Sequence, residues 1–429
     1  MREMKDSGVA WIGEIPEQWD ISTINSLYTL RNQKVSDRDY PPLSVTMKGI
    51  VPQLETAAKT DAHDDRKLVK KGDFAINSRS DRRGSCGISD YDGSVSLINT
   101  VLTPRGEMHP VYYNWLFHSS SFADEFYRWG HGIVDDLWTT RWQEMRNITI
   151  PVPEYAVQQK IAAHLDRKCA QIDALISSAQ QQIEKLKAYK QSVITETVTK
   201  GLDPDVKMKD SGVEWIGEIP EHWKVTNIGR LCFVTKLAGF EYTSHMVNNL
   251  SDDGEVPVVR AQNIKMGIFI DIISDYISME LSEKLHRCAL DKKCLLITFI
   301  GAGIGEVAIF NKEARYHLAP NVAKIVINEN YKEILSEEFL LFYLMSYAGQ
   351  EEVNKIKKAT AQPSLSMETI RSINFVIPTK NEQQAISDYL DRKCAQIDKL
   401  ITLKQQKIEK LQQYKKSLIY EYVTGKKEV

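Results

Sequence analysis

The most regular pattern of apolar and polar positions lies in two long stretches that contain neither glycine nor proline. In the first, residues 158–199, apolar side chains recur at alternating steps of four and three residues. The series is Ile172, Ile176, Ala179, Ile183, Leu186 and Val193, with Lys190 taking one place in it. This spacing predicts a long amphipathic helix whose coiled-coil seam is interrupted by a polar residue.

The second stretch, residues 383–424, repeats the pattern and shares the sequence LDRKCAQID with the first. Its seam positions are Ile397, Ile401, Ile408, Leu411 and Leu418, with Lys404 and Lys415 in the gaps. Prolines precede both stretches and a glycine follows each, as is typical of helix starts and stops. Helices of about 40 residues are roughly 60 Å long and rarely stable alone. We expect the two to pack on each other as an antiparallel coiled coil; a bundle with a separate partner is the alternative.

Another repeated segment precedes each region between the helices. Residues 4–19 read MKDSGVAWIGEIPEQW, and residues 208–223 differ from them at only two positions. The regions that follow, 20–150 and 224–375, share little sequence, so the chain runs constant–variable–constant twice. This internal duplication predicts a pseudo-twofold molecule whose constant parts meet the same partner twice. Segment 4–19 would then continue the second helix, as segment 208–223 continues the first, if the two chain ends lie close together.

Strand-like runs and turns fill the variable regions, as at residues 74–79 and 295–300. The predicted fold class is therefore α+β: two globular domains separated by two long antiparallel coiled-coil helices, with a pseudo-twofold internal repeat. Each domain begins with its repeated segment, and each is followed by a helical spacer. The expected order is domain 1–150, spacer 151–200, domain 201–375 and spacer 376–429.

Composition is that of an ordinary globular protein, with 42% hydrophobic and 26% charged residues. No apolar stretch is long enough to span a membrane, and the first residues lack the apolar centre of a signal peptide. The six cysteines form no CxxC pair and are expected to be reduced thiols, so we expect a cytoplasmic location and no membrane. The net charge of −2 provides no overall basic field, so a nucleic-acid binder would have to concentrate its positive residues locally.

Polar and basic residues gather where the strand-like runs end. They are Lys48, Ser78, Arg79, Arg82, Arg83 and Arg141 in the first variable region and Arg260, Gln262, Asn263 and Lys265 in the second. Arg, Gln and Asn make two-point contacts to base edges, and Lys and Ser suit phosphates, so these are candidate DNA-binding residues. A solvated loop is the alternative for any one of them. Trp138 and Trp142, on either side of Arg141, fit DNA contact or helix packing.

Signatures of catalysis are missing from the sequence. There is no GxxxxGK[ST] phosphate loop and no Asn-Pro-Pro-Tyr-like run of an adenine methyltransferase. The glycine-rich residues 301–305 follow a strand-like run but fit a hairpin better than a nucleotide-binding turn, because a strand and not a helix follows them. His286, Cys288 and Cys294 lack a second ligand pair for zinc. We therefore expect no catalytic residues, no metal and no cofactor in this chain.

With MKDSGVxWIGEIPExW before each variable region and LDRKCAQID in each long helix, the chain resembles the specificity subunit of type I restriction–modification systems. The resemblance covers the whole chain, including the order and number of its parts. It implies two target-recognition domains, each reading one half of a bipartite site in double-stranded DNA, at a spacing that the paired helices set. It also implies docking of two methyltransferase subunits, joined by restriction/translocase subunits. S-adenosylmethionine, ATP and Mg²⁺ would belong to those partners.

By the same resemblance, the partner-docking residues lie in the repeated segments. They are Trp11, Ile12, Pro16, Trp19, Leu165, Asp166 and Arg167, with Trp215, Ile216, Pro220, Trp223, Leu390, Asp391 and Arg392. The alternative is that each WIGEIP segment clamps its own helix ends, and both roles are compatible. Two other hypotheses remain for the whole chain: a two-lobed coiled-coil scaffold that binds only protein, and a self-contained DNA methyltransferase.

Overall fold

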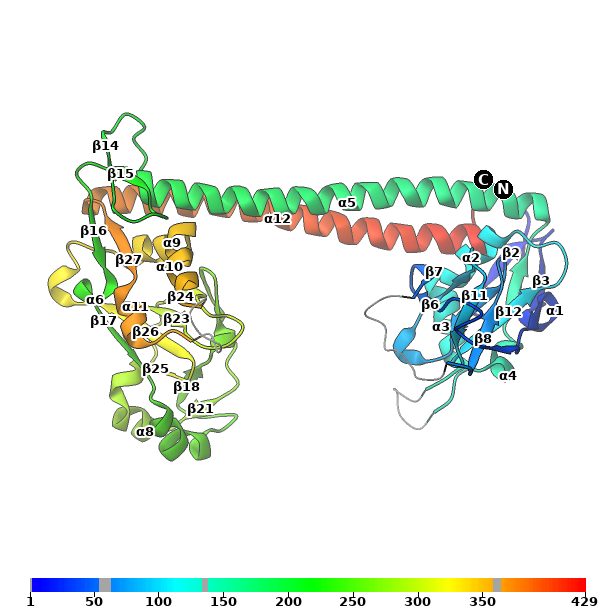
Figure 1. Ribbon diagram of the computed structural model, residues 1–429, viewed down its shortest axis with the longest axis horizontal. Coiled ribbons are helices and arrows are strands. Elements are labelled where there is room, and N and C mark those ends of the chain that lie inside the picture. The colour runs from blue at the N-terminus through cyan, green and yellow to red at the C-terminus, as the bar shows by residue number, and fades with distance from the viewer. Residues whose placement is uncertain (1, 54–62, 133–137, 358–363) are drawn as a thin grey trace. The chain divides into compact units, whose positions relative to one another are not determined.

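The computed structural model describes residues 2–53, 63–132, 138–357 and 364–429, and the chain divides into two compact units. Unit 1 comprises residues 1–180 and 405–429, and unit 2 comprises residues 181–404. Each unit contains one variable region and one stretch of each long helix (Figure 1). Within the described ranges no helix is both long enough and apolar enough to cross a lipid bilayer.

The two long helices are α5 (Tyr155–Lys200) and α12 (Lys380–Val423), as predicted. In unit 1, the rings of His164 and Tyr422 lie 4.5 Å apart, and Lys415 contacts Asp173 at 2.7 Å. Residue numbers therefore rise on α5 as they fall on α12, so the pair is antiparallel.

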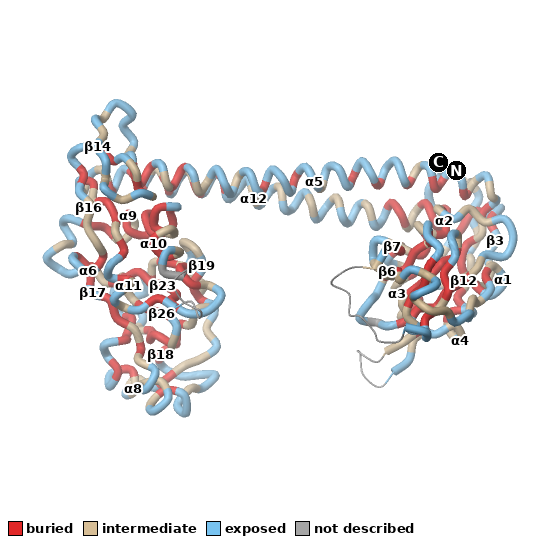
Figure 2. Tube along the Cα trace, in the orientation of Figure 1, coloured by how far each residue is buried: buried red, intermediate tan, exposed pale blue. Residues whose placement is uncertain are grey.

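Unit 2 shows the same direction independently. Lys404 donates to Gln182 at 2.6 Å, and Lys190 contacts Asp398 at 2.7 Å. Buried or half-buried positions recur along both helices at the spacing of the predicted seam (Figure 2). The expectation that the helices bury their seams on each other is confirmed within each unit.

The strands of unit 1 form small antiparallel sheets around an aromatic core. Their bounds are β1 Met4–Asp6, β2 Glu14–Pro16, β3 Asp20–Thr23, β4 Tyr28–Leu30, β5 Lys34–Val35, β6 Leu43–Thr46, β7 Gly49–Pro52, β8 Arg66–Val69, β9 Phe74–Asn77, β10 Cys86–Ile88, β11 Gly93–Ser96, β12 Asn99–Pro104 and β13 Thr149–Val152. The sheets have the orders β10-β9-β12-β4, β11-β8-β5, β1-β2, β3-β13 and β6-β7.

Short helices complete this unit: α1 Ile24–Leu27, α2 Pro110–His118, α3 Ser120–Arg128, α4 Trp142–Met145 and a 3₁₀ turn at Ser80–Arg82. The rings of Phe74 and Phe117 lie 4.3 Å apart, and those of Phe117 and Phe122 lie 4.8 Å apart. These contacts join the sheet to α2 and α3, and the same cluster reaches the seam residues of α5 and α12.

Unit 2 is built on a similar plan with more strands. Their bounds are β14 Met208–Asp210, β15 Glu218–Pro220, β16 Lys224–Asn227, β17 Cys232–Lys236, β18 Val256–Val259, β19 Ile264–Lys265, β20 Ile268–Phe269, β21 Tyr276–Ile277, β22 Ala289–Leu290, β23 Cys294–Thr298, β24 Val307–Phe310, β25 Tyr316–Leu318, β26 Val322–Ile327 and β27 Asn374–Ile377. The sheets have the orders β17-β26-β23-β24, β21-β18-β25-β22, β14-β15, β16-β27 and β19-β20.

The helices of unit 2 are α6 Ile228–Leu231, α7 Gly239–Glu241, α8 Met279–Lys284, α9 Glu337–Met345, α10 Tyr347–Lys357 and α11 Met367–Ser372, with a π-helical turn at Tyr242–Met246 and 3₁₀ turns at Val247–Asn249, Ala261–Asn263, His286–Cys288 and Glu329–Tyr331. β23 and β24 pair antiparallel across residues 299–306, so the glycine-rich run is the expected hairpin. Gly301 and Gly305 have φ of +99° and +88°, which favours glycine at both ends of that turn.

The two variable regions share a backbone frame despite their different sequences. β3 pairs with β13 in unit 1 as β16 pairs with β27 in unit 2. The Thr140 amide donates to the Ser78 carbonyl at 2.9 Å, and the Leu365 amide donates to the Phe299 carbonyl at the same distance. The duplication therefore extends through regions where its sequence signal is lost.

Candidate functional site

The repeated WIGEIP segments pack against the ends of the long helices in the same way in both units. In unit 1, a Cβ on Gly425 would lie 2.5 Å from Pro16 and 2.9 Å from Trp19. In unit 2, a Cβ on Gly201 would lie 3.3 Å from Trp223. Both glycines have positive φ, +73° and +81°, so each ends its helix and admits the indole and proline rings.

Hydrogen bonds join the two chain ends in unit 1. Lys426 Nζ donates to the carbonyls of Ile12, at 2.6 Å, and Glu14, at 2.9 Å. Arg2 donates to the Gly425 carbonyl at 2.5 Å. Segment 4–19 thus supplies the continuation of α12, as the sequence predicted if the chain ends lie close together.

Most predicted docking residues of these segments are therefore inside the units. The buried ones are Trp11, Ile12, Pro16, Trp19, Ile216, Pro220 and Trp223. Trp215 is half-buried, and its Nε1 donates to Glu352 at 3.0 Å. The intramolecular clamp is present, and a partner contact by these residues stays a prediction.

The LDR residues of the long helices divide by exposure. Leu165 and Leu390 are buried, whereas Asp166, Arg167, Asp391 and Arg392 are exposed. Trp115 Nε1 donates to Asp166 at 2.7 Å. Desolvation, followed by the nearby carboxylates of Asp388 and Glu338, raises the pKa of Asp391. The exposed Asp and Arg of each copy can reach a partner.

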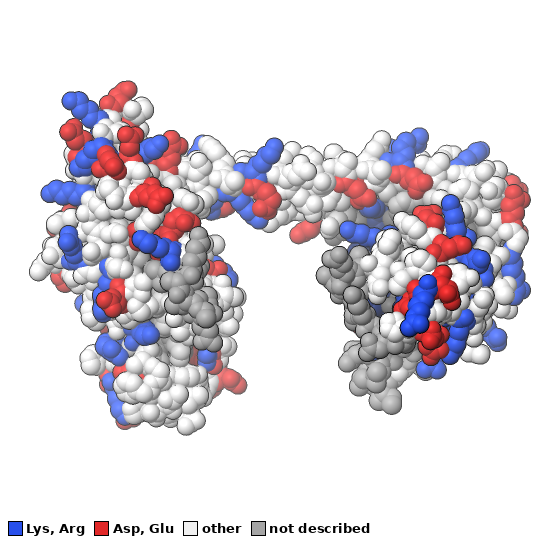
Figure 3. Space-filling view, viewed as in Figure 1, with Lys and Arg blue, Asp and Glu red and all other residues white. Residues whose placement is uncertain are grey.

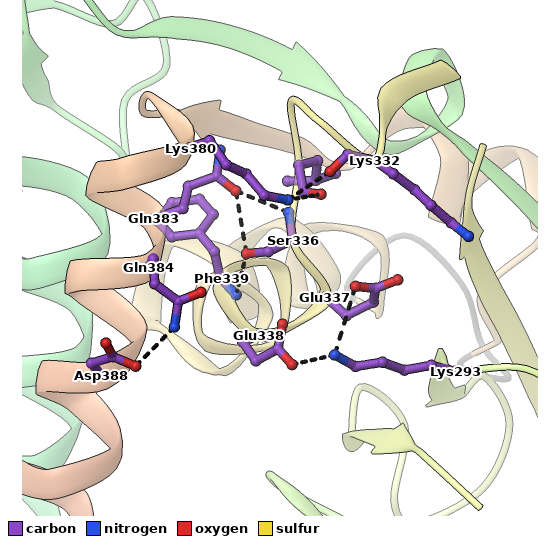
Figure 4. A network of polar contacts seen from close by, with 11 residues as sticks. Lys293, Lys332, Ser336, Glu337, Glu338, Phe339, Lys380, Gln383, Gln384 and Asp388 are labelled. Atoms are coloured by element: carbon purple, nitrogen blue, oxygen red, sulfur yellow. Dashed lines mark hydrogen bonds and ion pairs between the residues drawn. The ribbon is translucent and has the colours of Figure 1, made fainter. Parts of the chain in front are cut away.

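Sequence reasoning missed a pair of buried glutamines at equivalent places in the two copies. Gln158 accepts a hydrogen bond from the His109 amide at 2.9 Å, at the start of α2. Gln383 accepts one from the Ser336 amide at 2.9 Å, at the start of α9 (Figure 4). Each glutamine thus ties an internal helix to the first turn of a long helix. The available signal was the identity of these glutamines at the repeat spacing.

A second missed feature is an exposed leucine and an exposed tyrosine close in sequence to the residues of each interhelical ion pair. In unit 1, Leu175 lies two residues after Asp173, and Tyr414 lies one residue before Lys415. In unit 2, the equivalent Leu400 and Tyr189 lie in the same places beside Asp398 and Lys190. These four side chains are 47–52% exposed. We call each leucine–tyrosine pair a rod patch: Leu175 with Tyr414, and Leu400 with Tyr189.

The DNA-binding candidates of unit 1 lie mostly at the surface. Arg83 pairs with Asp124 and stacks on the Tyr127 ring at 5.0 Å, and Arg82 lies 3.7 Å from Asp81. Lys48, Arg79 and Arg141 are exposed and, within the described part of the unit, have no ion-pair partner. Ser78 is buried, with its hydroxyl 3.1 Å from that of Thr100.

Of the two tryptophans near Arg141, Trp138 packs internally. Its Nε1 donates to the Tyr127 carbonyl at 2.9 Å, and its ring stacks on the Tyr127 ring at a centroid distance of 5.7 Å. Trp142 begins α4 and is half-buried. Leu137, which precedes this stretch, lies outside the described residues.

The candidates of unit 2 follow β18 but are largely engaged within the unit. Arg260 pairs with Asp275, and this hydrogen bond raises the pKa of Arg260. Asn263 is buried and donates to two backbone carbonyls, and Lys265 lies 3.2 Å from Glu306. Gln262 is exposed. On the face drawn in Figure 3, positive and negative side chains are interspersed.

Comparisons with known proteins give a consistent family. A family model described as type I restriction modification DNA specificity domain matches residues 220–413. The chain is 24% identical to a putative type I restriction enzyme MjaX specificity subunit of Methanocaldococcus jannaschii, over 97% of this chain and 95% of that protein. It is 26% identical to the MjaVIII specificity subunit of the same organism, over 65% of this chain and 62% of that protein. The EcoBI specificity subunit of Escherichia coli is 25% identical over 60% of this chain and 53% of its own length.

Solved structures share the fold. One from a study of complex assembly and conformational transition of the type I R-M system has a TM-score of 0.73 at 12% identity, covering 95% of this chain and 98% of that chain. The HsdS subunit from Thermoanaerobacter tengcongensis has a TM-score of 0.51 at 14% identity, with 96% and 98% covered.

Proposed function

We propose that the chain is a type I restriction–modification specificity subunit, the DNA-recognition subunit of such a system, without catalytic residues of its own. The observation that carries this function is a duplicated frame that holds two unlike surfaces. At equivalent ladder positions, Arg79 and Thr139 in unit 1 correspond to Ile300 and Ser364 in unit 2. The same backbone therefore presents different side chains, as two different half-sites require.

Each variable region would contact its own half of a bipartite site in double-stranded DNA. In unit 1, Arg79 and Arg141 lack ion-pair partners within the described ranges and are available to phosphates or bases. In unit 2, Gln262 is the exposed member of the predicted set. Each variable region is followed in sequence by one long helix, and we propose that the lengths of α5 and α12 set the distance between the half-sites.

The rod patches support docking of two copies of one methyltransferase subunit. When a partner buries exposed leucine and tyrosine side chains, the loss of apolar surface from water stabilises the complex. Each patch pairs the same residue types, at the repeat spacing, beside the same Lys–Asp contact. A similar surface that occurs twice fits two copies of one partner. Restriction/translocase subunits would join through this complex, and S-adenosylmethionine, ATP and Mg²⁺ would be held by the partners.

Copurification with the methyltransferase subunit tests the docking. The wild-type complex is expected to contain two methyltransferase copies per chain by native mass measurement. Leu175→Asp or Leu400→Asp should each remove one copy, because a carboxylate placed in an apolar contact is desolvated. The neighbouring Ala174→Asp is the matched control and should keep both. Two copies retained in the double variant Leu175→Asp/Leu400→Asp would contradict this assignment.

DNA binding is tested by titrating duplex DNA with the copurified complex at several salt concentrations. Phosphate contacts release counterions, so affinity should fall steeply as salt rises. Absence of any salt-sensitive binding would favour the protein-only scaffold.

A further inference from the structure

A cleft of about 300 Å³ in unit 1 lies between the β11–β12 turn and the start of α4. The side chains that matter here are Lys67, Leu97, Ile98, Arg141 and Gln143. Of these, Arg141 alone belongs to the residues that the sequence singled out for DNA contact. The cleft therefore adds three kinds of group to that set: an ammonium, two aliphatic side chains and an amide.

One wall of the cleft is apolar and exposed. Leu97 and Ile98 form the two-residue turn between β11 and β12, and each is 38% exposed. The turn is held in place, since Asn99 Nδ2 donates to the Ser96 carbonyl at 3.0 Å and Lys67 Nζ donates to the Asn99 carbonyl at 2.7 Å. β11 and β12 lie in different sheets, so this turn connects two sheets, and its two adjacent exposed aliphatic side chains form a small apolar tip.

The remaining walls are positive and polar. Lys67 and Arg141 line the cleft, and among the described residues that line it none is a carboxylate. The hydroxyls of Ser78 and Thr100, also in the lining, bond each other and need no ligand. Gln143 is exposed at the rim, in the first turn of α4. The positive charges of Lys67 and Arg141 favour an anionic occupant, and the apolar tip adds a surface that phosphate alone does not use.

We infer that this cleft contacts the major-groove edge of a T·A base pair in the half-site of unit 1. Leu97 and Ile98 would pack on the thymine C5 methyl group, which is the apolar feature of the major groove. Gln143 has the two-point amide that matches adenine N6 and N7, and Lys67 and Arg141 would contact the adjacent backbone. This inference rests on the proposed function and assigns one position of its site.

The test compares thymine with uracil, which lacks only that methyl group. The recognised site is first obtained by sequencing methylated positions in genomic DNA from cells that carry the complex. Affinities of the copurified complex are then measured for duplexes in which single thymines are replaced by uracil. At one position, in the half read by unit 1, the wild-type affinity should fall roughly fourfold, the equivalent of one methyl group removed from water.

Variants locate that penalty on the cleft. Leu97→Asn/Ile98→Asn should bind the thymine and uracil duplexes equally, because the methyl contact is lost in both. Tyr91→Asn is the matched control: Tyr91 is another exposed turn residue of unit 1, flanked by Asp90 and Asp92, and lies outside the lining. Its thymine preference should be unchanged.

The outcomes separate the inference from the function on which it rests. The inference is overturned if Leu97→Asn/Ile98→Asn keeps a uracil penalty of wild-type size, or if the wild-type complex shows no penalty at any thymine. In either case, salt-sensitive binding of the site by the wild-type complex still supports the proposed function. Unaltered base preference together with loss of a copurifying protein would make the tip a protein contact, and also overturns it. Failure of the wild-type complex to bind DNA would refute the proposed function itself.

Discussion

Two of the three lysines that interrupt the helix seams, Lys190 and Lys415, are expected to fix the register of the helix pair. Lys190 occupies a seam position, yet its ammonium reaches both carboxylate oxygens of Asp398, at 2.7 and 2.8 Å. Its repeat equivalent Lys415 contacts Asp173 at 2.7 Å. A polar residue at a seam position favours the alignment in which it finds its partner. We therefore predict that Lys190→Glu destabilises unit 2 and that adding Asp398→Lys restores most of the loss.

The size of the effect follows from exposure. The Lys190 side chain is 24% exposed and that of Asp398 is 54% exposed, so solvent screens the attraction. A pair of this kind contributes about 0.5–1 kcal/mol, and like charges in the same place repel by a similar amount. Lys190→Glu should therefore cost about 1–2 kcal/mol, and the double reversal should return to within about 0.5 kcal/mol of the wild type.

Urea unfolding of the full chain, followed by helix circular dichroism, measures these differences. Lys187→Glu is the matched control, because Lys187 pairs with Glu184 on its own helix, whereas Asp398 pairs with Lys190. Adding Asp398→Lys to Lys187→Glu should give no rescue. The Lys190–Asp398 coupling should also shrink in 1 M salt, where the screening length is about 3 Å. Strictly additive losses for Lys190→Glu and Asp398→Lys would refute the register role.

Three further predictions concern spacing, the buried glutamine and acid stability. Inserting seven residues into each long helix should widen the unread gap by about 3 base pairs with both half-sequences unchanged, as read from methylated genomic sites. Gln383→Leu should cost about 1–3 kcal/mol in thermal unfolding, because the Ser336 amide loses its partner, whereas the exposed Gln384→Leu should be nearly neutral. Burial raises the pKa of Glu382, but hydrogen bonds from Thr379 outweigh burial and lower this pKa to about 2. The ionised Glu382 carboxylate therefore stabilises the fold at pH values above its unfolded pKa of about 4.5. That contribution should disappear as the pH falls toward 2, and Glu382→Gln should flatten the acid limb of the stability profile.

The repeated frame was predictable because its signals are local and explicit. Identity at a fixed spacing shows the duplication, and the four–three spacing of residues such as Ile172 and Ile176 shows the helices. The glycine after each long helix marks the helix end against which a WIGEIP segment packs. The contact between the chain ends was predictable from the same comparison, since segment 4–19 repeats the segment that follows the first long helix.

The candidate site was less predictable because exposure and pairing arise from contacts between distant segments. Arg83 and Arg260 find carboxylates 41 and 15 residues away, which no local pattern indicates. Gln383 is a polar residue of α12 that its sequence would place on a solvated helix face, but it is buried against the start of α9. Leu175 looks like a core residue, and only its burial state shows that it faces outward.

The central claim is that each variable region reads its own half-site from a shared frame. The most direct measurement replaces residues 20–150 with a second copy of residues 224–375 and sequences the methylated sites in cells that carry the resulting complex. The account predicts a symmetric site, in which the half read by unit 2 occurs twice in inverted orientation. An asymmetric site that is unchanged from the wild type would contradict it.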